Sequence, residues 1–97
     1  MSTEFLIPLD QLSRHYEVEI SFIGELHDFG LIEITTVDQV SFLHPDHLAQ
    51  LEKAIRLQHD LGLNMEGVDV VVHLLRRIEE LQQELQAARA QLRMYQV

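Results

Sequence analysis

The chain has 97 residues, enough for one small domain with one modest hydrophobic core. Its 16 acidic and 7 basic residues give a formal net charge of −9, and it contains no cysteine. These numbers exclude disulfides and cysteine-ligated metals and argue against nucleic acid as the partner of an acidic surface. Because the start lacks a basic region and no run approaches about twenty apolar residues, we expect a cytoplasmic protein without a membrane span.

The negative charge is concentrated in residues 1–63, here called the head. This part has eleven acidic residues against three basic ones, Arg14, Lys53 and Arg56, whereas the remainder is close to neutral. An acidic surface attracts basic partners. We therefore expect a basic protein as the partner, although an acidic surface also serves solubility alone.

The first third of the chain reads as a small strand followed by two short helices. The strand is expected at Glu4–Ile7, and Pro8 suits the first turn of a helix that covers about Leu9–His15. Ser21 is the expected N-cap of a second helix, with an apolar stripe of Phe22, Ile23, Leu26 and Phe29. Gly30 follows, where a left-handed residue commonly ends a helix. This order predicts a helix-turn-helix.

Two runs rich in β-branched and aromatic residues follow and predict a hairpin wing. They are Leu31–Thr35 and Gln39–Leu43, separated by residues 36–38. Because a two-stranded hairpin is weak alone, we expect the N-terminal strand to pair with it.

A third helix is predicted from Pro45 to Leu61 and is stopped by Gly62. Asn64 then caps a fourth helix that continues without proline to about Tyr95. Glycine at position 67, in the first turn of this helix, suggests that another group packs closely against it. We expect one domain over residues 1–97, with the head at 1–63 and the long helix at 64–97.

The long helix carries a heptad seam, defined by apolar side chains that recur three and four residues apart. We expect residues 68–75, which are apolar nearly all round, to be buried against the third helix. The later part predicts a homodimer, with Ile78, Leu81, Leu85 and Leu92 as dimerisation residues; intramolecular packing on the head is the alternative. The helix orientation is open. The seam comprises Val71, Leu74, Ile78, Leu81, Leu85, Ala88, Leu92 and Tyr95.

Two phrases carry a resemblance to known proteins. The element order and the phrase EISFIGELHDFGLI (Glu19–Ile32) resemble the MerR type of winged helix-turn-helix, and the run RLQHDLGLNMEGVDVVVHLLRRIEELQQEL (Arg56–Leu85) is similar to the chaperone modulator family CbpM. The resemblance implies a mainly α fold: a MerR-like winged helix-turn-helix with a small β-hairpin wing, followed by a long C-terminal helix. It also implies binding to the J-domain of CbpA, a DnaJ-like co-chaperone, and inhibition of its co-chaperone and DNA-binding activities.

The alternative function is that of a MerR-type dimeric DNA-binding transcriptional regulator. The second helix of such proteins carries arginines toward DNA. Here residues 21–29 contain Glu25, His27 and Asp28 but neither lysine nor arginine. Carboxylates facing phosphates lose the dominant electrostatic contribution to DNA binding, so we expect direct DNA binding to be weak.

The predicted partner-binding residues are Glu25, Asp28, Asp46, Arg56 and Asp60. Arg56 and Asp60 are four residues apart and lie on one face of the third helix. A structural role at the corner between the last two helices is favoured for this pair over a direct contact with the partner.

Other motifs carry no chemistry. His44-Pro45-Asp46 matches the signature tripeptide of J-domains, but it lacks a preceding basic helix and is interpreted as a helix start. Six histidines are scattered without metal-ligand spacing, and the chain lacks a phosphate loop and a catalytic triad. We expect no enzyme, no cofactor and no metal.

Overall fold

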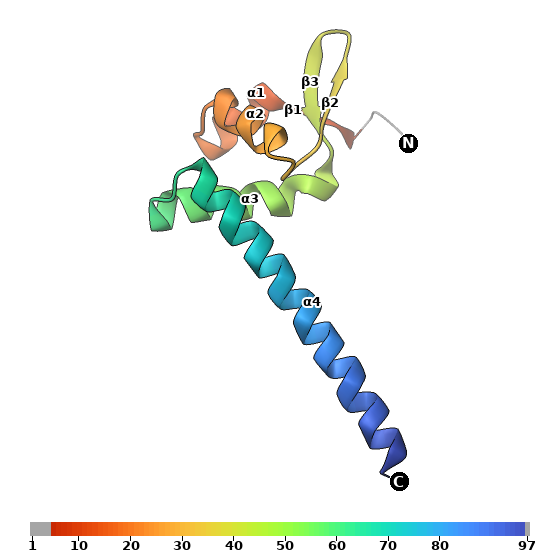
Figure 1. Cartoon of the computed structure of the whole chain (residues 1–97). Helices are drawn as coiled ribbons and strands as arrows, with labels where there is room; N and C mark the ends of the chain where they lie inside the picture. The colour runs from red at the N-terminus through yellow and green to blue at the C-terminus, as the bar shows by residue number, and fades with distance from the viewer. Residues whose placement is uncertain (1–4, 97) are drawn as a thin grey trace.

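The computed structural model describes residues 5–96 and shows a mainly α fold with a small β-sheet and one long C-terminal helix (Figure 1). The predicted order of elements is confirmed. Along the chain these elements are β1 (Ile7–Pro8), α1 (Leu9–Tyr16), α2 (Ile20–Asp28), β2 (Ile34–Val37), β3 (Val40–Leu43), the 3₁₀ turn η2 (Pro45–His47), α3 (Leu48–Leu61) and α4 (Met65–Tyr95).

A tight turn joins α1 to α2. Glu17 ends α1 in the left-handed region, with φ 55°, and its N–H donates to the carbonyl of Ser13. The expectation that Ser21 caps α2 is wrong, because the cap position is Glu19, whose backbone is extended. Ser21 lies inside the helix, and its hydroxyl donates to the Glu19 carboxylate. The propensity of serine for caps misplaced the start of α2 by two residues.

The sheet has three antiparallel strands in the order β1-β3-β2. The expected pairing of the N-terminal strand with the hairpin is confirmed by the register Ile7 opposite Leu43; residue 4 of that expected strand lies outside the described residues. The hairpin turn is shorter than expected, since Val37 pairs with Val40 and only Asp38 and Gln39 lie between them. Both turn residues have positive φ, 51° and 66°, as the turn type that matches strand twist requires.

The corner between α3 and α4 follows the sequence closely. Gly62 ends α3 with φ 64°, and the Asn64 side chain caps α4 by accepting a hydrogen bond of 2.9 Å from the Gly67 N–H. A Cβ atom on residue 67 would lie 3.2 Å from Asn64 Oδ1 and 3.3 Å from Leu63 Cβ. The close packing expected at Gly67 is therefore confirmed, and the capping group itself is the close neighbour.

One apolar cluster holds the head together and includes the first turns of α4. Burying each of its larger side chains stabilises the fold by about 1.5–3 kcal/mol. The buried members are Leu9, Leu12, Phe22, Ile23, Leu26, Leu31, Ile32, Leu43, Leu51, Ala54, Met65 and Val68. The predicted burial of residues 68–75 is only partly right, because Val70, Leu74 and Leu75 are exposed and Val68 is the fully buried residue of this segment.

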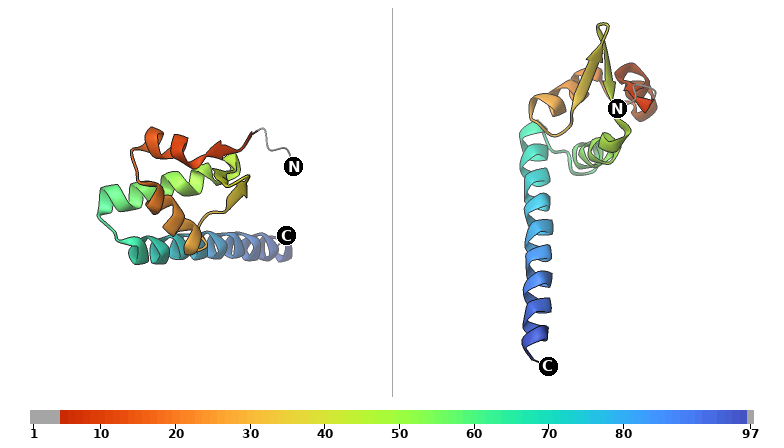
Figure 2. Two further views of the ribbon diagram at one scale, coloured as in Figure 1. Left: turned by 90° about the horizontal axis from the view of Figure 1, so that it is seen from above. Right: turned by 90° about the vertical axis from the view of Figure 1, so that its right-hand side faces the viewer.

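Beyond its first turns, α4 extends away from the head (Figures 1 and 2). The radius of gyration is 17.7 Å, whereas a compact domain of this length has about 13 Å. From residue 73 to residue 96 every side chain is exposed. Among the described residues, no helix is both long and apolar enough to cross a membrane. The organisation as one domain stays a prediction, which the single core supports.

Candidate protein interface

Most of the large exposed apolar side chains of the described chain lie on α4. The four predicted dimerisation residues are all about half exposed: Ile78 48%, Leu81 47%, Leu85 50% and Leu92 57%. Arg77 pairs with Glu80 at 3.1 Å and with Glu84 at 3.9 Å, which are contacts along the helix itself. A contiguous stripe of exposed leucine and isoleucine is a typical mark of an interface.

The outer face of α2 carries the first two predicted partner-binding residues. Glu25 and Asp28 are both exposed, whereas Phe22, Ile23 and Leu26 hold the other face of the helix in the core. The C-terminal end is fixed by Gly30, with φ 75°. This helix therefore presents carboxylates to the solvent from the position of a recognition helix.

A groove between α1 and α3 was not anticipated from the sequence. Its centre is a hollow of about 280 Å³ lined by Tyr16, Glu52, Ile55 and Arg56. The Tyr16 hydroxyl donates a hydrogen bond of 3.2 Å to Glu52 Oε2 and so joins the end of α1 to α3. Burial, the hydrogen bond to Glu52 and the charge of its carboxylate, in that order, raise the pKa of the Tyr16 phenol above its ordinary value.

Two further hollows continue this groove in both directions along α3. Toward the start of α3 a hollow of about 270 Å³ shares Tyr16 with the centre and reaches Leu48. Toward the end a hollow of about 310 Å³ shares Arg56 with the centre and is lined by α3 residues alone, which are Lys53, Arg56, Leu57, Asp60 and Leu61. We call the three together the α1–α3 groove. Sequence reasoning missed it because the pairing of Tyr16 with Glu52, 36 residues apart, has no local signal.

The predicted partner-binding residues do not form one cluster. Arg56 and Asp60 lie in the last part of the α1–α3 groove. Asp46 lies in η2, before the start of α3, about 20 Å from Asp60 by the rise of a helix. Among the ion pairs of residues 5–96 none joins Arg56 to Asp60, so the expected structural pair is not formed. Asn64 and Gly62 make the corner without it.

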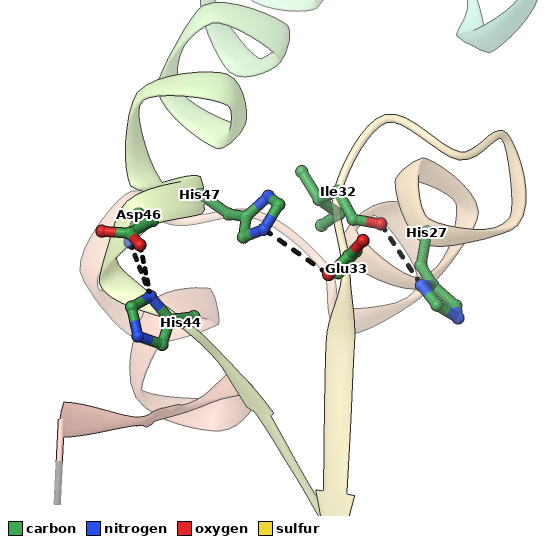
Figure 3. Close-up of polar contacts among 6 residues, drawn as sticks. All are labelled: His27, Ile32, Glu33, His44, Asp46 and His47. Atoms are coloured by element: carbon green, nitrogen blue, oxygen red, sulfur yellow. Dashed lines mark hydrogen bonds and ion pairs between the residues drawn. The ribbon is translucent and has the colours of Figure 1, made fainter. Parts of the chain in front are cut away.

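Histidines make polar contacts near the base of the wing (Figure 3). His44 Nδ1 accepts a hydrogen bond of 3.1 Å from the Asp46 N–H and caps η2, which confirms the interpretation of His44-Pro45-Asp46 as a helix start. His47 Nε2 lies 3.9 Å from Glu33 Oε2, across the gap between η2 and the strand leading into the wing. Within the described part of the chain, no three histidine or acidic side chains gather to hold a metal ion.

These observations define a class. Two short helices joined by a tight turn, a three-stranded wing and a long projecting helix make a regulatory protein of the winged helix-turn-helix type. The chain belongs to the MerR HTH regulatory protein family, whose family model matches residues 7–90. The MerR-like fold expected from the sequence is thereby confirmed.

Curated relatives make the similarity more specific. Chaperone modulatory protein CbpM of Escherichia coli O1:K1 / APEC is 27% identical over 85 residues, which cover 87% of this chain and 84% of the relative. The CbpM proteins of Escherichia coli O45:K1 (strain S88 / ExPEC) and of Escherichia coli O139:H28 (strain E24377A / ETEC) match with the same identity and coverage. The resemblance to the CbpM family is thus confirmed. No solved structure matches the chain.

Proposed function

We propose that this protein is a chaperone modulator that binds the J-domain of a CbpA-like, DnaJ-type co-chaperone and inhibits its co-chaperone and DNA-binding activities. The observation that carries the proposal is the similarity to CbpM over 87% of the chain. J-domains present a basic helix to the DnaK chaperone. A modulator that covers this helix prevents the J-domain from docking on DnaK. It does so by binding alone, without catalysis.

The charge of the head supports this proposal. Residues 1–63 contain eleven acidic and three basic residues, and one of those cations, Arg14, faces Asp10 at 3.7 Å. Complementary charge accelerates association with a basic partner and rejects partners of like charge, more than it adds affinity. Glu25, Asp28, Asp46 and Asp60 contribute to this field, with Arg56 beside Asp60.

We also propose that α4 pairs with a second copy along the seam. The support is the exposure of Ile78, Leu81, Leu85 and Leu92 on a helix that leaves the head and has no described neighbour there. A heptad seam of leucine and isoleucine buries these side chains in a two-helix interface. The two functions use different parts of the molecule, so that the dimer leaves the head accessible.

The direct test is a calorimetric titration with the purified J-domain of a CbpA-like co-chaperone at low and high salt. Saturable binding of one J-domain per chain, weakened by salt, is the expected result. Absence of heat at both salt concentrations, with a folded protein shown by circular dichroism, would overturn the proposal.

The second candidate is a MerR-type regulator that binds promoter DNA as a dimer. The family match over residues 7–90 favours it, together with the exposed position of α2 and the wing. Against it stands the composition of α2, which contains no lysine or arginine. Proteins bind DNA mainly through phosphate contacts from cations, so retardation of promoter DNA in a gel at physiological salt is the result that would favour this function.

A further inference from the structure

The α1–α3 groove is long enough to bind a helix from another protein. Because its hollows share Tyr16 at one side and Arg56 at the other, it follows α3 from Leu48 to Leu61. Fourteen residues of helix span about 20 Å, which corresponds to about four turns of an incoming helix. Apolar side chains along its floor include Leu12, Leu48 and Ile55.

The charged side chains of the groove alternate along α3. Glu52, Arg56 and Asp60 follow one another at four-residue intervals and therefore share one face of the helix. Lys53 also lines the last hollow, beside Arg56 and Asp60. Opposite charges at this spacing often pair with each other, yet none of the ion pairs found in residues 5–96 involves these three side chains. The Glu52 carboxylate is instead oriented by the Tyr16 hydroxyl. The face is left to meet charges from another chain.

The position of the groove keeps it free when α4 pairs. In both views of Figure 2, α3 lies between α1 and α4. No α4 residue lines the three hollows of the groove, although Lys53 of the last hollow also borders a hollow that α3 forms with α4. Repulsion disfavours a second copy of the head as the occupant, because each head carries eleven acidic residues against three basic ones. A basic partner has the complementary sign.

We propose that the α1–α3 groove receives an amphipathic helix of the partner, with basic side chains opposite Glu52 and Asp60, an acidic one opposite Arg56 and an apolar one beside Ile55. This proposal rests on the proposed function and names its contact surface and the pattern that the surface recognises. The α2 carboxylates then act at a distance, through the field that steers the basic partner.

The test compares two double variants that change the net charge by the same amount. Glu52→Lys with Asp60→Lys reverses two charges in the groove, and Glu25→Lys with Asp28→Lys reverses two on α2. With the purified J-domain as the probe, we expect the groove variant to bind at least about tenfold more weakly, and the α2 variant to lose about threefold or less through weaker steering. Equal losses, or a larger loss for α2, would overturn the proposal.

The Arg56→Glu variant distinguishes the effect of a direct contact on J-domain affinity from the effect of the overall charge of the head. The substitution makes the head more acidic, so attraction at a distance would strengthen binding to a basic partner. If Arg56 faces a carboxylate of the bound helix, the affinity falls about tenfold instead, and an unchanged or higher affinity contradicts the proposal. Arg56 is exposed, and circular dichroism checks that each variant is folded. A wild-type chain that fails to bind the J-domain shows that the proposed function itself has failed.

Discussion

Tyr16 and Glu52 join two elements that are far apart in the sequence. Tyr16 is the last residue of α1, and its phenol donates a hydrogen bond of 3.2 Å to Glu52 Oε2 in the middle of α3. The ring of His15 stands against the Tyr16 ring edge to face, with centroids 4.7 Å apart. The contact links the end of α1 to α3, and both residues line the centre of the α1–α3 groove.

The first prediction concerns the ionisation of Tyr16. Its raised pKa means that the folded state holds the phenolic proton more tightly than the unfolded state. The associated stability is therefore fully present below the ordinary pKa of tyrosine, about 10, and is lost as the pH rises through the higher pKa of the folded state. We expect Glu52→Gln to lower the pKa of Tyr16, because it removes the negative charge beside the phenol.

The measurement is an ultraviolet titration of tyrosinate in a Tyr95→Phe background, which leaves Tyr16 as the one tyrosine of the chain. Glu33→Gln, which removes an exposed carboxylate at the base of the wing, is the matched control and leaves the titration unchanged. A Tyr16 pKa that stays the same after the Glu52→Gln substitution contradicts the contact.

The second prediction concerns the corner at Asn64 and Gly67. Alanine in a helix is favoured over glycine by about 1 kcal/mol, but here Gly67→Ala places Cβ 3.2 Å from the capping Asn64 Oδ1. We expect Gly67→Ala to give little or no stabilisation, and Asn64→Ala to cost about 1 kcal/mol as a lost cap. With Asn64→Ala already present, Gly67→Ala should be more favourable than in the wild-type chain, because the contact with Asn64 Oδ1 is gone and only the one with Leu63 remains. Urea unfolding of the wild-type chain, the two single variants and the double variant measures this coupling. Changes in the free energy of unfolding that simply add would contradict it.

The third prediction concerns the wing. Asp38 and Gln39 occupy left-handed positions, which cost a residue with a side chain about 1–2 kcal/mol relative to right-handed ones. Gln39→Gly removes this strain at some cost in the entropy of the unfolded chain, so we expect a net gain of about 0.5–1 kcal/mol. Thr36→Gly, at an ordinary strand position in the same hairpin, is the control and should destabilise. Thermal unfolding compares both, and a lower midpoint for Gln39→Gly would refute the turn geometry.

Local signals in the sequence predicted most of the fold. Gly30, Gly62 and Asn64 act where expected, because each depends on backbone conformation or on a hydrogen bond within a few residues. Pro8 was expected in the first turn of α1 but is the extended cap residue before it, within β1. The prediction that Ser21 caps α2 was wrong, because the extended residue Glu19 precedes the helix without any side-chain cap. Leu31 and Ile32 read as strand residues, but the turn after Gly30 places them in the core before β2 begins.

The candidate site was less accessible to sequence reasoning. The exposed residues Glu25, Asp28, Asp46 and Asp60 were selected by charge, and the fold distributes them over α2, η2 and the end of α3. Their role in binding stays a prediction. The α1–α3 groove depends on a long-range contact and on the angle between helices, and no periodicity in the chain encodes either. Burial of residues 68–75 was overestimated for a related reason: hydropathy does not show where α4 leaves the head.

The last prediction concerns the association of α4. Leu81→Glu with Leu85→Glu places two carboxylates on adjacent seam positions, where a partner helix would have to bury them. Desolvating unpaired charges costs several kcal/mol, and the variant also loses the burial of two leucines from each copy, so we expect a monomer. Gln83→Glu with Ala90→Glu adds the same charge on the opposite side of the helix and should leave the dimer intact.

Sedimentation equilibrium over a range of concentrations measures the mass of each protein in solution and so distinguishes the monomer from the dimer. The fold of the head should survive in the seam variant, because Leu81 and Leu85 touch none of its core and the α4 residues buried there are Met65 and Val68. J-domain binding measured on the same variant then shows whether the head acts alone. A wild-type chain that sediments as a monomer at all concentrations would contradict the proposed pairing of the exposed seam with a second copy.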